Sequence, residues 1–366
     1  MKKAYFITIH VGWNFGSVLQ AIATYKILSD LLPGYDVTLV DYVPPRVTYM
    51  RVLRNSFKSL KAFAKLPFSL LQKRYNDALY LSDLRKYCPA TRRVYNINQI
   101  GKVLKDAELL ITGSDQTWNS VHNEGIDRAY YWDYLNPSIR RIAFASSIGR
   151  SEVPAEEYNY LQKVLKSFSF ISVREESAVK LLSSMGVKSE LFLDPTLMID
   201  KEQWCSYINK RMIDEPYILV YLPYNINDKS IILDSIKKLR QTKHIKVVTF
   251  SWGMFNDKDN YADKTVHYAS PLDFLSLMCF ADYVITNSFH GTAFSINLNK
   301  QFWVYYPSQF TTRIESLLNF TGLQSRHMNS VLTDGQIDGT IDYSVVNNLL
   351  NVERQRSSSI LRKVQN

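Results

Sequence analysis

Cysteine is scarce in this chain, with only three such residues among 366. Cys88, Cys205 and Cys279 are odd in number and far apart in the sequence, so they provide neither a disulfide framework nor the closely spaced thiol pairs of a zinc site. So little cysteine in a chain of this length is typical of a reducing compartment. The scarcity therefore argues against a disulfide-stabilised secreted protein and against a zinc-binding domain.

Long apolar runs are also absent. No stretch reaches the roughly 18 to 20 consecutive apolar residues of a membrane-spanning helix. The N-terminal segment MKKAYFITIH contains an apolar run of only about seven residues, which is shorter than a secretory signal requires. The sequence therefore predicts a cytoplasmic protein.

The overall composition is that of a globular protein, with 46% hydrophobic and 21% charged residues. A length of 366 residues exceeds one ordinary core and suggests two domains. The 24 tyrosines and 18 phenylalanines could form either cores or carbohydrate-binding platforms, and cores are the more frequent use. The net charge of +10 points to anionic partners, such as phosphate groups, nucleic acid or a membrane surface.

Short apolar runs alternate with helical patterns along the chain. AYFITIH precedes VLQAIATYKILSDLL, and PYILVYLP precedes SIILDSIKKLRQT. Continuous apolar strands between helices are typical of parallel sheets that are covered on both faces. We therefore predict an α/β protein with two Rossmann-like domains, residues 1–200 and 201–340, that face each other across a cleft. Residues 341–366 are expected to form a C-terminal helix that packs back on the first domain.

In open α/β sheets, ligands bind beyond the carboxyl ends of the strands, and this rule selects four stretches. The first is HVGWNFGSVLQA, where a glycine permits close backbone approach and free N–H groups at a helix start attract anions. It lacks the three-glycine dinucleotide fingerprint. A substrate-binding loop and a tight turn with Ser17 as the N-cap fit this stretch equally well. Its candidate residues are Asn14, Gly16 and Ser17.

The second stretch is LLITGSDQTWN, in which Asp115 follows an apolar strand. A carboxylate at this edge could accept a proton from a sugar hydroxyl, whereas the alternative is that Asp115 caps the next helix. Hydrogen-bonding and stacking groups follow directly and favour a functional role: Gln116, Trp118 and Asn119.

The third stretch, FISVREESAV, places Arg174 at the start of a helix, where a cation opposes the helix dipole. Either a ligand phosphate or carboxylate, or an ion pair with a neighbouring acid, would explain it.

The fourth stretch, VITNSFHGTAFSINLNK, places His290 in the turn between a strand and a helix, with Gly291 allowing the backbone to approach a ligand. A structural histidine is the alternative. A histidine at this edge could hold or donate a proton near a phosphate.

Together, the segments NFGSVLQAIA, ITGSDQTWN, SVREESAV with the downstream LDPT, and SFHGTAFSI resemble the polysaccharide pyruvyl transferase family. The resemblance extends from about residue 10 to about residue 330 and implies a glycosyltransferase-B-like fold. It also implies transfer of pyruvate from phosphoenolpyruvate to two hydroxyls of a sugar, which gives a pyruvate ketal. The acceptor would be a lipid-linked precursor of a surface polysaccharide, such as an exopolysaccharide or capsule.

The resemblance also implies roles for individual residues. His290 and Asp115 would be catalytic, one as the acid or phosphate partner and the other as the base, with their roles open to exchange. In some relatives an arginine stands where this chain has Ser288. The resemblance further implies that the first domain holds the acceptor with residues of the first two stretches: Asn14, Gly16, Ser17, Gln116, Trp118 and Asn119. The second domain would be the donor side, and the donor-binding set is Arg174, Ser288, Gly291, Thr292, Arg313 and Arg326.

No cofactor or metal ion is expected, since phosphoenolpyruvate acts as a co-substrate. Asp257 and Asp259 in FNDKDN are interpreted as part of a polar surface turn rather than a metal site. Two other functions remain open: a nucleotide-sugar glycosyltransferase of the same fold, and a non-catalytic glycan-binding relative.

A basic helical insertion is predicted at about residues 46–90. No Asp or Glu occurs from Arg46 to Asn76, and Leu53, Phe57, Leu60 and Phe63 follow at helical spacing. An apolar stripe on a cationic helix is typical of an interfacial membrane helix. This would place the protein peripherally on the inner face of the plasma membrane, with Arg46–Arg74 as the contact. The alternative is that the stripe packs on the first domain. No nucleic-acid-binding motif accompanies the charge, so nucleic acid is not an expected partner.

Overall fold

The structure is a computed structural model that describes residues 1–59, 63–226, 228–251, 261–309 and 311–364. It divides into two compact units. Unit 1 comprises Met1–Pro195 with Gln355–Asn366, and unit 2 comprises Thr196–Arg354. Each unit contains one parallel sheet, which confirms the prediction of two parallel-sheet α/β domains. The division falls at Pro195 rather than at residue 200, and helix α16 (Tyr343–Lys363) contributes its first part to unit 2 and its last part to unit 1.

Unit 1 contains a six-stranded sheet in the order β2-β1-β3-β4-β5-β6, and all neighbouring strands pair in parallel. The inner strands are almost wholly buried because helices cover both faces of such a sheet. The strands are β1 (Lys2–Ile7), β2 (Tyr35–Leu39), β3 (Ala107–Thr112), β4 (Arg140–Ser146), β5 (Phe170–Val173) and β6 (Glu190–Leu191). The helices are α1 (Phe15–Leu31), α2 (Tyr49–Ser56), α4 (Leu66–Tyr87), α5 (Ile97–Val103), α6 (Ser120–Asn123), α7 (Ala155–Leu165) and α8 (Glu176–Ser184), with short 3-10 turns at Pro45–Val47 and Arg128–Tyr130.

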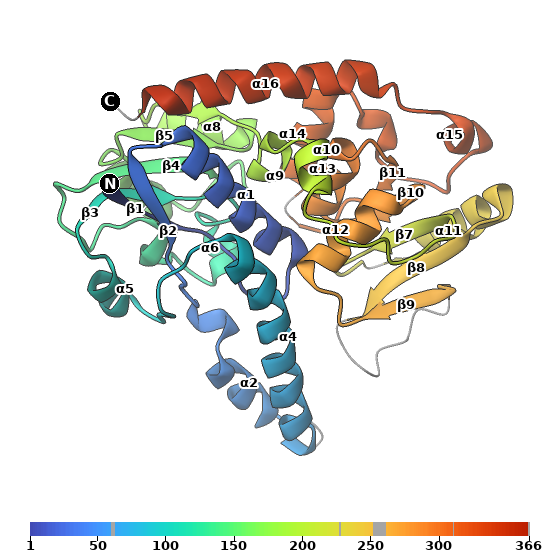
Figure 1. Cartoon of the computed structure of the whole chain (residues 1–366), viewed down its shortest axis with the longest axis horizontal. Coiled ribbons are helices and arrows are strands. Elements are labelled where there is room, and N and C mark those ends of the chain that lie inside the picture. Colours follow the sequence, from blue (N-terminus) through green and yellow to red (C-terminus); the bar gives the residue numbers. More distant parts are fainter. Residues whose placement is uncertain (60–62, 227, 252–260, 310, 365–366) are drawn as a thin grey trace. The chain divides into compact units, whose positions relative to one another are not determined.

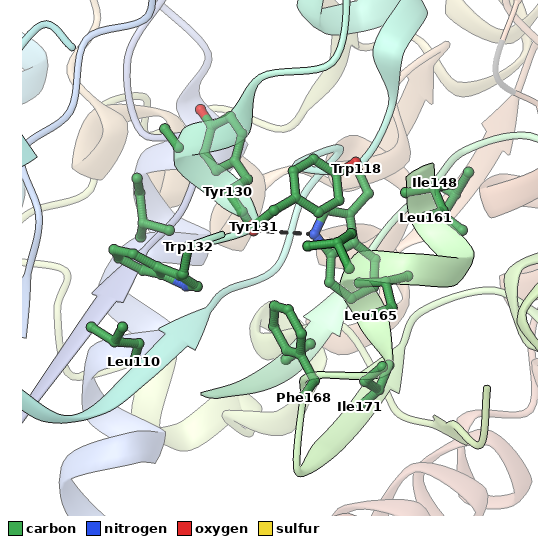
Figure 2. Packing of buried hydrophobic residues seen from close by; sticks show 14 of the residues in the cluster. Leu110, Trp118, Tyr130, Tyr131, Trp132, Ile148, Leu161, Leu165, Phe168 and Ile171 are labelled. Atoms are coloured by element: carbon green, nitrogen blue, oxygen red, sulfur yellow. Dashed lines mark hydrogen bonds between the residues drawn. The ribbon is translucent and has the colours of Figure 1, made fainter. Parts of the chain in front are cut away.

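The core of unit 1 is rich in aromatic side chains (Figure 2). Trp118 stacks on Tyr131 with the ring centroids 6.0 Å apart, and Phe168 meets the same indole edge-on at 5.9 Å. Tyr130 and Trp132 are also completely buried. In this region the abundant aromatic residues therefore form core, not an exposed platform.

Unit 2 contains a five-stranded parallel sheet in the order β11-β10-β7-β8-β9. Its core joins strand residues such as Ile218, Ile285 and Trp303 to the buried face of α11. The strands are β7 (Tyr217–Tyr221), β8 (Lys246–Ser251), β9 (Lys264–His267), β10 (Tyr283–Thr286) and β11 (Gln301–Val304). The helices are α9 (Pro195–Met198, beginning at the division), α10 (Lys201–Cys205), α11 (Ser230–Lys243), α12 (Pro271–Phe280), α13 (Phe289–Asn297), α14 (Thr312–Thr321) and α15 (Asp334–Asp338), with a 3-10 turn at Gln324–Arg326.

The basic insertion forms a helical hairpin of α2 and α4, which extends away from the sheet of unit 1 (Figure 1). The expected single helix through Leu53, Phe57 and Phe63 is wrong, because α2 ends at Ser56. The Ser56 hydroxyl donates to the Val52 carbonyl. Such a hydrogen bond from a serine side chain to the helix backbone competes with continuation of the helix. Leu60 of the expected stripe lies outside the described residues.

Candidate functional site

The carboxyl edge of the unit 1 sheet gathers polar side chains from distant segments. Asp115 follows β3 and is almost fully buried, and its backbone φ of 72° lies in the left-handed region. One carboxylate oxygen accepts a hydrogen bond from the Ser17 hydroxyl at 2.6 Å. The other accepts from the Gln116 amide at 2.8 Å and from the Arg174 guanidinium at 3.3 Å. Left-handed backbone at a non-glycine residue is costly, and such strain is concentrated at functional sites.

Arg174 lies between two carboxylates of unit 1. Its Nη1 contacts Asp194, and its Nη2 contacts Asp115. Burial alone would lower the pKa of Arg174, but the nearby Asp194, Asp115 and Glu175 together raise the pKa above its usual value. The ion-pair alternative that the sequence left open is thus present. Asp194, from the LDPT segment, also accepts a hydrogen bond from Ser114 at 3.1 Å, so it belongs to the same network although sequence reasoning did not select it.

The β1–α1 loop delivers Ser17 to this network. Asn14 is the N-cap of α1, since its side chain accepts from the Ser17 amide. The alternative in which Ser17 is the cap is therefore wrong, and its hydroxyl is directed to Asp115 instead. Gly16 lies buried in the first turn of the helix. The capping interaction and the Ser17–Asp115 bond together fix this loop against the end of β3.

The expected acceptor residues after Asp115 serve the core and the chain turn. Trp118 is completely buried, and its indole N–H donates to the Tyr130 carbonyl at 3.3 Å, as Figure 2 shows, so no indole face is open for stacking on a sugar. Asn119 is the N-cap of α6 and also donates to the Gln116 side chain at 2.7 Å. The expected roles of Trp118 and Asn119 in acceptor binding do not fit these contacts.

A second buried polar cluster follows β1 and β2 in unit 1. His10 Nε2 lies 3.1 Å from Asp41, and its Nδ1 lies 3.1 Å from the Thr8 carbonyl. Arg93 donates to both carboxylate oxygens of Asp41 at 3.2 Å. Burial opposes ionisation of Asp41, but His10 and Arg93 lower its pKa to about 2. The position of His10 at a strand end was the only sequence signal for this cluster.

In unit 2, His290 lies in the first turn of α13 rather than in the turn before it, because the helix begins at Phe289. The imidazole is buried and meets the Phe289 ring edge-on at 5.3 Å. Ser288 is the N-cap, and its hydroxyl accepts from the Gly291 amide at 3.3 Å. The strand-to-helix connection thus presents His290 directly after the carboxyl end of β10.

Gly291 is required by packing rather than by a ligand. A Cβ atom at this position would come within 2.3 Å of Thr286 Oγ1. That hydroxyl donates to the Tyr221 carbonyl at 2.7 Å and accepts from the Ser288 amide at 3.1 Å, so it is fixed in place. Thr292 is completely buried and donates to the Ser288 carbonyl at 2.9 Å. Gly291 and Thr292 thus have packing and hydrogen-bonding roles in the fold, and their expected donor-binding roles stay predictions.

The two arginines expected to supplement the donor site differ in position. Arg313, at the start of α14, lies with its guanidinium 5.3 Å from the centre of the Phe289 ring, next to His290. Arg326 instead lies over Trp303 and donates to the Gly339 carbonyl at 3.0 Å. Because Trp303 belongs to the core of unit 2, Arg326 is a packing residue, and its expected role in donor binding does not fit.

Among the described residues, no three His, Cys, Asp or Glu side chains gather as a metal site would require. Asp257 and Asp259 lie outside those residues. No helix in the described part of the chain has both the length and the apolar character needed to cross a bilayer. The thiols of Cys205 and Cys279, distant in sequence, lie 3.3 Å apart in unit 2.

Comparison with known proteins identifies the family. The sequence model of the family described as polysaccharide pyruvyl transferase matches residues 14–309, which is most of the chain. The chain belongs to the polysaccharide pyruvyl transferase family. Members of this family are transferases of polysaccharide biosynthesis, and the match covers the segments that hold Asp115, Arg174 and His290. A search of curated proteins gives no match.

Solved structures provide more distant likenesses. An S. aureus MnaA structure with UDP has a TM-score of 0.49 at 13% identity and covers 98% of this chain and 91% of its own. UDP-GlcNAc 2-epimerase of Neisseria meningitidis bound to UDP-GlcNAc has a TM-score of 0.48 at 12% identity, covering 96% and 98%. Glycosyltransferase SsfS6 of Streptomyces sp. SF2575, complexed with thymidine diphosphate, has a TM-score of 0.46 at 13% identity, covering 100% and 99%. The fold assignment rests on the two parallel sheets of the pyruvyl transferase chain itself.

Proposed function

We propose that this pyruvyl transferase family member transfers the pyruvyl group of phosphoenolpyruvate to two hydroxyls of a sugar. The methylene carbon of the donor gains a proton, and the first hydroxyl adds to the neighbouring carbon. Phosphate then leaves, and the second hydroxyl closes the ketal. One of the two hydroxyl protons ends on the new methyl group and the other on phosphate, so atoms and charge balance.

The observation that carries this proposal is the combination of the family match with the strained, buried Asp115 at the carboxyl edge of unit 1. Its carboxylate accepts three hydrogen bonds, which fix its orientation. A fixed carboxylate at this edge suits a base that removes a hydroxyl proton. The Ser17 hydroxyl, already bonded to it, marks where an acceptor hydroxyl could bind.

Arg174 has a revised role in this proposal. A guanidinium whose two terminal nitrogens already face Asp194 and Asp115 is better suited to hold the base than to bind the donor. Such a buried charge network is stable only when every charge has its partner. Arg174 and Asp194 are therefore assigned as positioning residues for Asp115.

The donor site is assigned to unit 2. His290 would protonate the methylene carbon or stabilise the leaving phosphate, since an imidazole titrates near neutral pH. The donor carries a carboxylate and a phosphate, which require cationic groups and N–H donors. Arg313, over the neighbouring Phe289 ring, supplies a cation, and the first turn of α13 supplies backbone N–H groups.

The proposed acceptor is a lipid-linked precursor of a surface polysaccharide. Support comes from the family match and from the basic insertion of unit 1, which would bring such an enzyme to the inner face of the plasma membrane.

The test is turnover with phosphoenolpyruvate and a panel of glycan acceptors, followed by phosphate release and by the mass gain of one pyruvyl ketal. His290→Asn should abolish turnover while the chain still folds, as a cooperative melting transition would show. Full activity of this variant would refute the catalytic assignment.

A binding experiment separates the proposal from the glycosyltransferase alternative. Phosphoenolpyruvate at about 100 times its dissociation constant should stabilise the protein by roughly 2.7 kcal/mol. Stabilisation by nucleotide sugars alone, with none by phosphoenolpyruvate, would contradict pyruvyl transfer and favour glycosyl transfer.

A further inference from the structure

The α2–α4 hairpin carries an unusual number of exposed apolar side chains. Phe57 is 70% exposed and Phe63 51% exposed, and their ring centroids lie 5.7 Å apart. On α4, Phe68, Leu71 and Tyr75 follow at spacings of three and four residues and are all exposed, so they share one helix face. Met50 on α2 is also exposed. We call these six side chains the apolar face of the hairpin.

The charge around this apolar face has one sign. Arg54, Lys58, Lys65 and Arg74 are exposed, and no Asp or Glu occurs between Arg46 and Asn76. The cations that do form ion pairs lie toward the base of the hairpin, where Arg51 contacts Glu124 and Lys73 contacts Asp77. A cationic surface with exposed aromatic residues is complementary to an anionic lipid bilayer, which accepts both the charge and the rings.

The base of the hairpin is firmly held on unit 1. Tyr80 of α4 stacks on Phe15 with centroids 5.3 Å apart. Trp13 donates its indole N–H to Asp77 at 2.9 Å, and Lys73 lies over the rings of Trp13 and Tyr49. The apolar face is therefore presented by anchored helices. Its anchor is the same β1–α1 loop that brings Ser17 to Asp115.

We infer that the hairpin is a membrane-binding element that inserts Phe57, Phe63, Phe68 and Leu71 into the interface of an anionic leaflet. Lipid binding follows from the hairpin alone and is independent of the reaction. One consequence rests on the proposed function: bound in this way, the hairpin holds the acceptor edge of unit 1 close to the bilayer, where a lipid-linked glycan would be found.

Vesicle flotation of the full chain tests this inference. The protein should float with vesicles that contain phosphatidylglycerol and not with phosphatidylcholine alone, and raising the salt to about 0.5 M should weaken binding because exposed charges are screened. Phe57→Ser with Phe63→Ser should lower the partition coefficient at least about tenfold, since two exposed rings no longer insert. Arg54→Glu with Lys58→Glu should abolish the preference for phosphatidylglycerol.

The matched control is Val345→Ser with Val352→Ser, which removes two apolar side chains of α16 that are 57% and 58% exposed. This control should bind vesicles like the original protein, and all variants should melt at the same temperature. The inference is overturned if the protein stays with the soluble fraction at low salt, if the hairpin variants bind unchanged, or if the same residues instead mediate self-association or oligonucleotide binding. Activity on a soluble acceptor reports the reaction separately, so an original protein that is fully active but does not float refutes only the membrane role.

Discussion

Replacement of Gly291 by alanine should destabilise unit 2 for a reason that the structure makes quantitative. The added Cβ would meet Thr286 at 2.3 Å from Oγ1, 3.1 Å from Cβ and 3.2 Å from Cγ2. Thr286 cannot move aside easily, because its hydroxyl bonds to both Tyr221 and Ser288. Overpacking of this kind costs about 1–3 kcal/mol. The better helix propensity of alanine returns roughly 0.5–1 kcal/mol, so the middle of the two ranges gives a net loss of about 1 kcal/mol.

The assay is calorimetric unfolding of the intact chain. A loss of this size in a unit of this length should lower the melting temperature of the unit 2 transition by about 2–4 °C. Gly335→Ala is the matched control, since Gly335 lies in α15 and no atom comes within 4 Å of its added Cβ. That variant should be neutral or stabilised by up to about 1 kcal/mol. Equal or higher stability of Gly291→Ala would refute the packing explanation and return this glycine to a role in ligand approach.

Two further predictions concern groups outside the proposed reaction. The pKa of Asp41 is lowered to about 2 from an ordinary value of 3.8. Its ionised carboxylate therefore adds about 2 kcal/mol to the free energy of unfolding above pH 4, and this stabilisation is lost as the pH falls toward 2. The stability difference between the original protein and Asp41→Asn, measured by urea unfolding, should shrink by that amount over this range, and a constant difference would contradict the assignment. Cys205 and Cys279, 3.3 Å apart as free thiols, should form a disulfide with oxidised glutathione, seen as a loss of two hydrogens by mass spectrometry. Burial raises the pKa of Cys279 to about 11, so disulfide formation should accelerate as the pH rises. Cys88→Ser is the control and should not prevent the disulfide. Formation of a disulfide in Cys205→Ser would disprove this pairing.

The fold was predictable because each inner strand is a continuous apolar run between two helical patterns. That pattern arises only where both faces of a sheet are covered, so it fixes the class of sheet directly. The basic insertion was less predictable. Helical spacing suggested one helix through Phe57, but the chain turns after Ser56, and local serine bonding decides such boundaries more than the apolar period does.

The candidate site was predictable in position but not in its partners. The rule that ligands bind at carboxyl strand ends selected Asp115, Arg174 and His290, and each of them follows a strand in the structure. The contact between Arg174 and Asp194 joins two strand ends, and that between Ser17 and Asp115 spans 98 residues. No local pattern encodes such pairings. Trp118 was misassigned because a tryptophan near a site has the same sequence signature whether its ring faces ligand or core.

Ser288 lies where the cap of α13 and the proposed donor site meet. Its hydroxyl caps α13 through the Gly291 amide, and an arginine at this position would lose that cap while adding a charge. A serine cap typically contributes about 1 kcal/mol to helix stability. With the cap in place, the first turn that carries His290 is fixed, and under the proposed function a cation for the donor would come from another segment. Arg313 fulfils this condition, because it reaches the Phe289 ring from α14 without disturbing the cap. Under the proposed function, the serine at 288 would fix the turn that carries the histidine, and the arginine at 313 would supply the positive charge.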